Sequence, residues 1–365
     1  MTRLRTDRRK PRRGFTMVEL MVVVGLIVFL MSISIAVLGS AIGIARQRAT
    51  QATILKIHGL MQQRVDAFNR AMERTNLQPA MDKLVRDLGI PVRRAREDKF
   101  YQVLAKKQIF QSRFPQNFSE RDISTLTSTF VSANHNKDTE SSALLYWLLT
   151  NSEVFGISPV DDSEFSSNEV RDTDSDGLLE FVDGWGRPLR FYRWPTQLFR
   201  PGTASIPAGV TGSGTPTVLS TVDRTYASLI WSGLPAAPIA AGDLDPLTRD
   251  PDDPTGQIMR YVKNSAASNQ TTVMTTIQNR FHTPDTFHAF LIMSAGPDGK
   301  MGLGEPWNPV ISGLPSPSTQ GSMVITTPTL DLKGQGRLAA VSTYSANPVD
   351  IVNHPLNDNI SNRKR

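Results

Sequence analysis

The chain has 365 residues, a formal net charge of +6 and no cysteine. Residues 1–14 carry seven basic side chains against one acidic side chain, so this short segment accounts for the whole +6 and residues 15–365 are formally neutral. The high pI therefore does not indicate a nucleic-acid partner, and the lack of cysteine excludes disulfides and cysteine-ligated zinc.

The first predicted element is an uncharged apolar segment from Leu20 to Ala45. As a helix these residues would extend about 39 Å, which is enough to cross a hydrocarbon core of about 30 Å. The basic residues before the segment place residues 1–14 in the cytoplasm by the positive-inside rule. A cleaved secretory signal is the alternative, because Ala41–Ala45 offers small residues. The apolar run is longer than such signals usually are.

A stripe of apolar residues continues beyond this segment at helical spacing. Its members are Ile54, Ile57, Met61, Val65, Phe68 and Met72. Steps of three and four place them on one face of an amphipathic helix. We therefore expect a single helix that is embedded in the membrane over residues 15–45 and packs on a soluble domain over residues 46–75.

The start of this helix carries a specific motif. Gly14-Phe15-Thr16-Met17-Val18-Glu19-Leu20 resembles the N-terminal cleavage and methylation motif of type IV pilins and type II secretion pseudopilins. The resemblance implies that a prepilin peptidase cuts between Gly14 and Phe15 and methylates the new N-terminus of Phe15. Glu19 then becomes the fifth mature residue. It can neutralise the Phe15 amine of a neighbouring subunit, so that two costly charges in the bilayer form one pair.

The resemblance also implies an architecture and a set of partners. The expected fold is α+β and pilin-like, with the long N-terminal helix packed on a small antiparallel sheet and with large helical and loop insertions. The expected partners are other copies of the chain, related pseudopilins, the prepilin peptidase and an inner-membrane secretion assembly platform. We expect a single-pass protein of the inner membrane, with a periplasmic C-terminal domain, that assembles into a pseudopilus.

One position departs from the pattern of the family. Ala36 stands where many members have a helix-breaking proline. Gly39 and Gly43 could supply flexibility instead, because glycine weakens a helix interior by roughly 1 kcal/mol relative to alanine.

The soluble part is long for a single core, so one domain with large insertions, or two lobes, is expected. Residues 76–160 are predicted to be a helical insertion, residues 161–306 a pseudopilin-like β region with loops, and residues 307–365 a polar tail that frays after Asn357.

Helices are predicted at 79–88, 92–113, 139–155 and within 255–281, and strands at 189–194, 227–231 and 287–294. The basic residues within 92–113 are expected to form a solvated helix face rather than an anion-binding patch.

An acidic loop at Asp172–Asp183 has the D-x-D-x-D-G start of a calcium loop. The predicted ligands of Ca²⁺ are the carboxylates at positions one, three, five, nine and twelve and the carbonyl at position seven. These are Asp172, Asp174, Asp176, Glu180, Asp183 and Leu178. No flanking EF-hand helices are evident, so the loop would be an isolated one. The alternative is an acidic surface loop held by Asx turns.

A second loop offers another position for the ion. Asp183–Leu189 contains D-x-W-G-x-P, and Ser294–Gly299 contains S-x-G-x-D-G after a predicted strand. This pair resembles the major pseudopilin of type II secretion, in which the later loop helps to bind calcium. The resemblance implies Asp298 as a ligand, but the other carboxylate of the family falls on Leu291. We expect Trp185 to pack on the sheet rather than to contact a partner.

No catalytic constellation is evident. None of the five histidines lies in H-E-x-x-H, and there is no phosphate-binding loop or nucleophile elbow. His282, His288 and the Asp250–Asp253 segment are expected to be ordinary polar residues. We therefore expect a structural subunit and not an enzyme. The alternative is a membrane-anchored calcium-dependent binding protein or hydrolase that uses the helix only as an anchor.

Overall fold

The structure is a computed structural model. It describes residues 16–88, 99–120, 135–195, 250–265, 269, 272–273, 276–277, 280–282, 288–301, 305–306 and 358–363. Gly14 and Phe15 lie outside the described residues, as do the predicted strand at 227–231 and most of the predicted tail at 307–365. The chain divides into two compact units, Met1–Arg46 and Gln47–Arg365.

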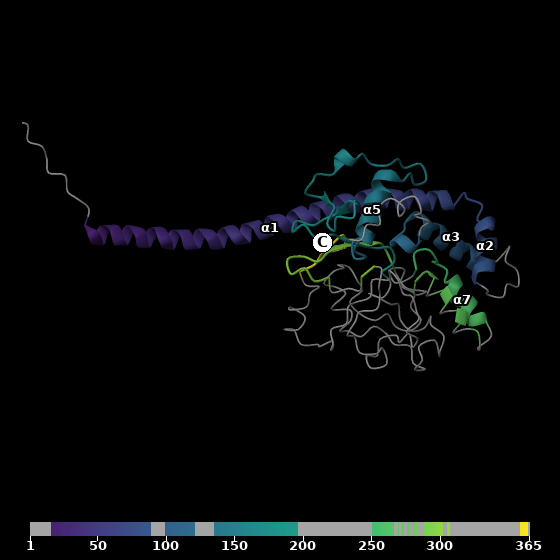
Figure 1. Ribbon diagram of the computed structural model, residues 1–365. Helices are drawn as coiled ribbons and strands as arrows, with labels where there is room; N and C mark the ends of the chain where they lie inside the picture. The colour runs from purple at the N-terminus through teal and green to yellow at the C-terminus, as the bar shows by residue number, and fades with distance from the viewer. Residues whose placement is uncertain are drawn as a thin grey trace, which may run out of the picture. The chain divides into compact units, whose positions relative to one another are not determined.

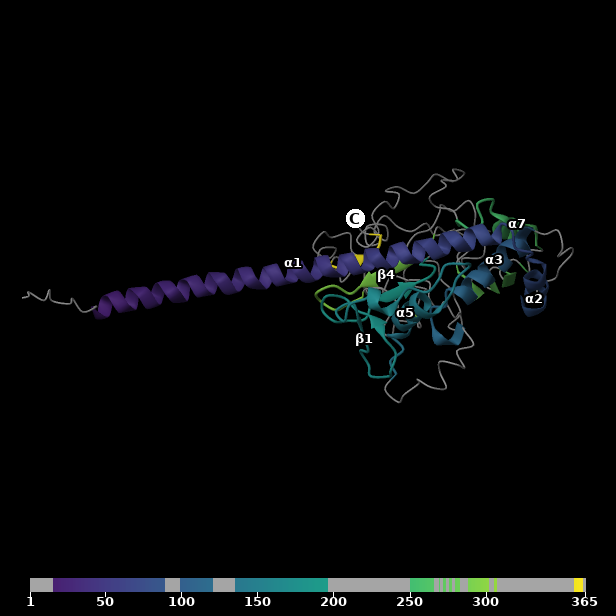
Figure 2. The same cartoon turned by 90° about the horizontal axis from the view of Figure 1, so that it is seen from above.

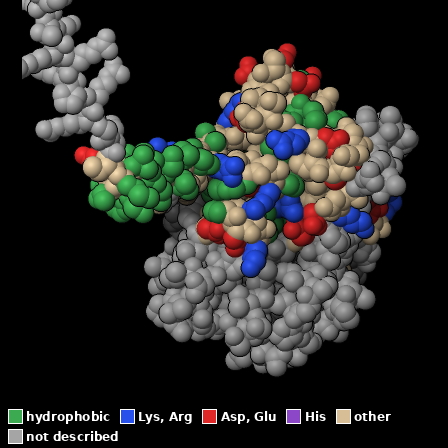
Figure 3. Space-filling view, turned by 60° about the vertical axis from the view of Figure 1, so that its left-hand side comes forward, with side chains coloured by type: hydrophobic (Ala, Val, Ile, Leu, Met, Phe, Trp, Pro, Cys, Tyr) green, Lys and Arg blue, Asp and Glu red, His purple; other side chains and the backbone are tan. Residues whose placement is uncertain are grey.

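One continuous helix, α1, extends from Met17 to Met72, as the sequence predicts (Figure 1). It passes through Gly39 and Gly43 without interruption. Within the first unit, the large apolar side chains of α1 are exposed, for example Phe29 at 62% and Leu38 at 61%. Apolar side chains form the surface of this stretch (Figure 3). Among the described helices, α1 is the one long and apolar enough to cross a membrane.

In the second unit, α1 contributes the predicted stripe to a hydrophobic core. Ile54, Ile57, Met61 and Phe68 are almost completely buried. They belong to one cluster with residues of helix α5 (Glu140–Asn151) and of the strands. The predicted stripe is confirmed. Its residues recur at the spacing of a helix, and this spacing is a local property of the sequence.

The described residues of this unit form two small antiparallel sheets. Strands β1 (Val170–Arg171) and β2 (Glu180–Phe181) form the first sheet. Strands β3 (Arg190–Tyr192), β4 (Leu291–Ser294) and β5 (Ile360–Ser361) form the second, in that order. Phe191 pairs with Ile292, and Ser294 pairs with Ile360. The predicted fraying after Asn357 is therefore wrong for residues 358–363, because β5 adds to the edge of β4 and Ile360 is buried.

Helix α5 packs on β2 and β3. A second core joins helices α2 (Gln78–Leu88), α3 (Lys99–Arg113) and α7 (Gln257–Asn264). These three helices group near the C-terminal end of α1 in both views (Figures 1 and 2). Short 3₁₀ turns at Phe118–Glu120 and Asp162–Glu164 complete the described elements.

Candidate functional site

The first candidate site is the N-terminal turn of α1, where Thr16 and Glu19 hold each other. The Thr16 N–H and hydroxyl donate to Glu19 Oε2 at 2.8 and 2.9 Å, and the Glu19 N–H donates to Thr16 Oγ1 at 3.2 Å. This reciprocal pair is a capping box, which satisfies two helix-end donors. The sequence carries its T-x-x-E signature, so the cap could have been recognised there. Glu19 Oε1 takes no part in the cap.

The second candidate site is the loop between β1 and β2. Ligand-type oxygens of four carboxylates lie within 4.8 Å of one another there: Asp172, Asp174, Asp176 and Glu180. Ser175 and Gly177 have positive φ angles of 62° and 91°. These angles curl the backbone around the carboxylates. The positive φ at position 177 favours glycine, which has no Cβ. Asp172 Oδ1 accepts from the Ser175 N–H at 2.7 Å, and its Oδ2 accepts from the Gly177 N–H at 3.1 Å.

Glu180 is the most constrained member of this group. It begins β2 and is completely buried. Its Oε2 accepts from the Thr173 N–H at 2.7 Å and from the Thr173 hydroxyl at 2.9 Å. Its Oε1 is also buried, and no donor among the described residues is within hydrogen-bonding distance of it. Burial raises the pKa of Glu180 to about 7, with hydrogen bonds from Thr173 opposing the rise and the charges of Asp174 and Asp176 adding to it.

The acidic loop also contacts the start of α5. Asp174 Oδ2 accepts from the Asn136 N–H at 2.8 Å and from the Thr139 hydroxyl at 3.0 Å. His135 Nδ1 lies 2.6 Å from Asp176 Oδ2, and its Nε2 lies 3.2 Å from Glu140 Oε1. Burial alone would lower the pKa of His135, but the bonds to the two carboxylates outweigh it and raise the pKa. The loop and the helix are thus held together through side chains.

Asp183, predicted as the twelfth ligand, does not join this group. Its Oδ1 accepts from the N–H groups of Trp185 and Arg187 at 2.9 and 3.0 Å, and its Oδ2 accepts from the Ser294 hydroxyl at 2.7 Å. The physical reason is that the chain enters β2 at Glu180, so Asp183 lies in the next turn instead of closing the acidic loop. The structure therefore places Asp183 apart from the four carboxylates of the acidic loop.

Asp298, the ligand implied by the resemblance, lies in a separate turn after β4. It is exposed, and its Oδ1 accepts from the Lys300 N–H at 2.7 Å. The carbonyls of this turn face Arg187, whose Nη1 donates to Gly296 O at 2.6 Å and to Pro297 O at 3.3 Å. A Cβ at Gly299 would lie 2.7 Å from Arg187 Cζ. The Arg187 guanidinium thus lies against the carbonyls of this turn.

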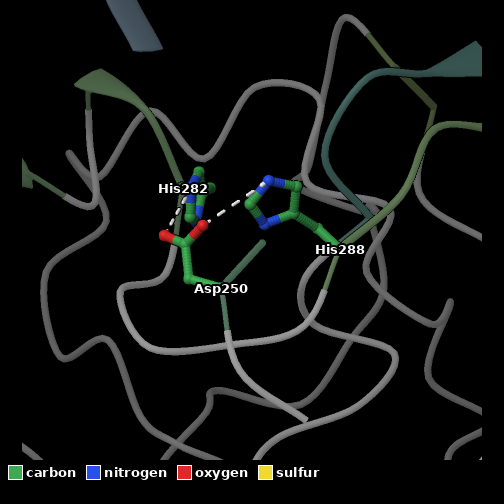
Figure 4. A group of neighbouring side chains, drawn as sticks. All are labelled: Asp250, His282 and His288. Atoms are coloured by element: carbon green, nitrogen blue, oxygen red, sulfur yellow. Dashed lines mark ion pairs between the residues drawn. The ribbon is translucent and has the colours of Figure 1, made fainter. Parts of the chain in front are cut away.

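A third group, buried between α3 and the chain around residues 250–288, was not predicted. His282 and His288 both approach the Asp250 carboxylate (Figure 4), with Nε2–Oδ distances of 3.6 and 3.8 Å. Lys107 Nζ lies closer, 2.8 Å from Asp250 Oδ2. Although the three residues could in principle bind a metal, the ammonium already neutralises the carboxylate, so the group is a buried ion-pair network.

Lys107 corrects the expectation of a solvated basic face on this helix. The Lys107 side chain is completely buried. Burial alone would lower its pKa, but Asp250 and Asp252 outweigh this effect and raise it. Its partners are 143 and 145 residues away in the sequence, so local pattern could not reveal them.

Comparison with known families identifies the N-terminal segment. Residues 9–35 match the family model described as the prokaryotic N-terminal methylation motif. This motif indicates a type IV pilin-like precursor. The matched segment includes the predicted cleavage position and Glu19, and it points to a structural protein rather than an enzyme. Neither a curated protein nor a solved structure matches the chain.

The described architecture agrees with this pilin-like N-terminus. A long helix with an apolar first part precedes small antiparallel sheets and further helices. The α+β class predicted from the sequence is therefore confirmed. The match covers residues 9–35 alone, so the sites in the second unit depend on their own geometry.

Proposed function

We propose that this protein is a structural pseudopilin subunit of a type II secretion-like system. A prepilin peptidase cleaves it between Gly14 and Phe15 and methylates Phe15, and the mature chain assembles into a periplasmic pseudopilus. The observation that carries this proposal is the methylation motif at residues 9–35, which continues directly into an exposed apolar helix. Glu19 is the single charged residue between positions 15 and 45.

The geometry of the capping box supports a specific role for Glu19 in assembly. Thr16 binds Oε2, and this leaves Oε1 free of the cap and available to an incoming ammonium group. Cleavage creates that ammonium on Phe15 of a neighbouring subunit. Two charges that are each costly in hydrocarbon become one pair, and they do so only when subunits pack side by side.

The topology follows from the distribution of charge. The basic leader stays on the cytoplasmic side, and the apolar part of α1 spans the inner membrane. The second unit then projects into the periplasm. The partners are other copies of this subunit, related pseudopilins, the peptidase and the assembly platform of the inner membrane.

A secretion pseudopilus is preferred to a surface pilus because of the D-x-W-G-x-P turn. Asp183 binds the backbone of that turn and reaches Ser294 at the end of β4. The two segments that resemble a major pseudopilin are therefore in contact, which supports a related arrangement of the β region.

Mass spectrometry of the mature protein from membranes tests the processing step. We expect a chain that begins at Phe15 and carries one additional methyl group. A chain that still begins at Met1, or one cut near Ala45 as a signal peptide would be, contradicts the proposal.

Cross-linking of subunits in membranes tests assembly. Glu19→Ala should abolish the cross-linked ladder, whereas Glu73→Ala, an exposed acid just beyond α1, should leave it intact. Both variants should keep the melting temperature of the wild type. A protein that uses α1 only as an anchor, such as a binding protein or hydrolase, would tolerate Glu19→Ala without loss of function.

A further inference from the structure

We propose that the loop between β1 and β2 is a calcium site with Asp172, Asp174, Asp176 and Glu180 as its side-chain ligands. This inference concerns the second unit and does not depend on the proposed role in a pseudopilus. It also changes the ligand set that the sequence suggests, because Asp183 and Asp298 are left out.

The first observation is the convergence of the four carboxylates. Their oxygens lie within 4.8 Å of one another, and the loop curls around them at Ser175 and Gly177. Like charges this close repel one another, and a cation between them converts the repulsion into attraction. Carboxylate oxygens are also the ligands that Ca²⁺ prefers.

The second and independent observation is Glu180 Oε1. Glu180 is completely buried, and this oxygen has no donor among the residues that the structure describes. Burial of a carboxylate oxygen without a partner is unfavourable. The same side chain belongs to the group of four, so a cation bound by the other three carboxylates would supply the missing partner.

The neighbouring turn at 294–300 does not compete for the ion. Arg187 donates to the carbonyls of Gly296 and Pro297, so the turn already has a cationic group against its carbonyls. Asp298 is exposed and accepts from the backbone of its own turn. The D-x-D-x-D-G loop therefore remains as the position at which a buried acidic oxygen, Glu180 Oε1, has no donor among the described residues.

The choice of calcium follows from the donor set and from access. The group of four contains only oxygen, and Ser175 and Gly177 are exposed at its outer side, which leaves room for water ligands. Mg²⁺ demands a near-ideal octahedron that four protein carboxylates seldom supply. A second, overlapping group of His135, Asp174 and Asp176 contains nitrogen and suits zinc better. That group lacks the unsatisfied oxygen of Glu180.

Binding would stabilise the junction between the loop and α5. Asp174 and Asp176 already contact Asn136, Thr139 and His135 at the start of that helix. An ion held by the same carboxylates would join the two segments through a rigid centre. The chain has no cysteine, so the ion would provide the kind of cross-link that disulfides provide in many proteins outside the cytoplasm.

The test uses the full-length protein in detergent, stripped of metal with EGTA. Calorimetric titration with CaCl₂ should show one site, and the melting temperature should rise with the concentration of CaCl₂. Asp172→Asn and Glu180→Gln should each weaken calcium binding by about 10-fold or more. The matched control, Asp298→Asn, should bind as the wild type does. MgCl₂ and ZnCl₂ are titrated in parallel.

Several outcomes would overturn the site. These are no calcium binding at millimolar CaCl₂, binding retained in Asp172→Asn, or binding lost in Asp298→Asn alone. A zinc response without a calcium response would assign the loop to the His135 group instead. If Glu180→Gln does not fold, calcium binding by Asp172→Asn still tests the site, because Asp172 is partly exposed. None of these results bears on processing or assembly at the N-terminus.

Discussion

The Ser294 hydroxyl donates a 2.7 Å hydrogen bond to Asp183 Oδ2, and both side chains are buried. The two residues are 111 positions apart. Their bond joins the turn that precedes β3 to the end of β4, and Arg187 from the same turn binds the carbonyl of Gly296. The D-x-W-G-x-P turn and the S-x-G-x-D-G turn, which each resemble a major pseudopilin in sequence, are thus in contact around a buried carboxylate.

The first prediction concerns this bond. Ser294→Ala removes a donor from a buried carboxylate and should lower the free energy of unfolding by about 1–3 kcal/mol. Urea denaturation of the full-length protein in detergent measures the change. Ser112→Ala is the control, because its hydroxyl is exposed and binds only a carbonyl of its own helix. Equal effects of the two substitutions would contradict the importance of the Asp183 contact.

The second prediction concerns the cap of α1. Thr16→Val removes the hydroxyl that binds Glu19 while keeping the shape of the side chain. We expect partial loss of cross-linked assembly, smaller than the loss in Glu19→Ala, because the carboxylate loses its orientation but keeps its charge. Thr16→Ser keeps the hydroxyl and should assemble normally. If Val and Ser behave alike, the capping box has no part in assembly.

The third prediction concerns pH. Arg193 binds Glu120 through two bonds of 2.6 and 2.7 Å. Burial alone would raise the pKa of Glu120, but Arg193 outweighs it and lowers the pKa. The stabilisation is therefore fully present above the unfolded-state pKa of about 4.3 and is lost as the pH falls through the folded-state pKa.

Replacement of this glutamate makes the effect measurable. Glu120→Gln should cost about 3–5 kcal/mol at pH 7, because Arg193 remains buried without its counter-charge. The difference from the wild type should shrink as the pH falls below about 4. Urea denaturation over a pH series measures both effects. Glu153→Gln, at an exposed position, should parallel the wild type throughout. A difference that does not depend on pH would refute the assignment.

The fourth prediction concerns the buried network at Asp250. Lys107→Met leaves this carboxylate without its ammonium and should lower the free energy of unfolding by about 3–5 kcal/mol. Lys106→Met breaks a more exposed pair with Asp252 and should cost about 1 kcal/mol or less. Adding Asp250→Asn to Lys107→Met should restore part of the loss. Comparable losses in the two single variants would show that burial of Lys107 is not decisive.

The sequence was sufficient to predict helices, strands and buried faces where these depend on local spacing. Ile57 and Met61 are buried as their helical periodicity predicts, and β3 and β4 lie within predicted strands. It was insufficient where a partner is remote. Lys107 is buried because Asp250 lies beside it, and no pattern near residue 107 indicates that contact.

The candidate sites divide in the same way. Asp172, Asp174, Asp176 and Glu180 lie close together, as their positions in one short loop predict. Asp183 lies apart from them because β2 begins at Glu180 and carries the chain away from the loop. The Thr16 cap depends on residues three positions apart, so its T-x-x-E signature is readable from the sequence.

The short strand β5 has a consequence for the time course of synthesis. Asn362 binds His58 across 304 residues, and Ile360 pairs with Ser294. When β4 has left the ribosome, its outer edge must wait for β5, a delay on the order of several seconds at about 5–20 residues per second. An open edge can accept a strand from another chain. Pauses in translation between residues 294 and 360 would therefore raise the yield of mispaired subunits.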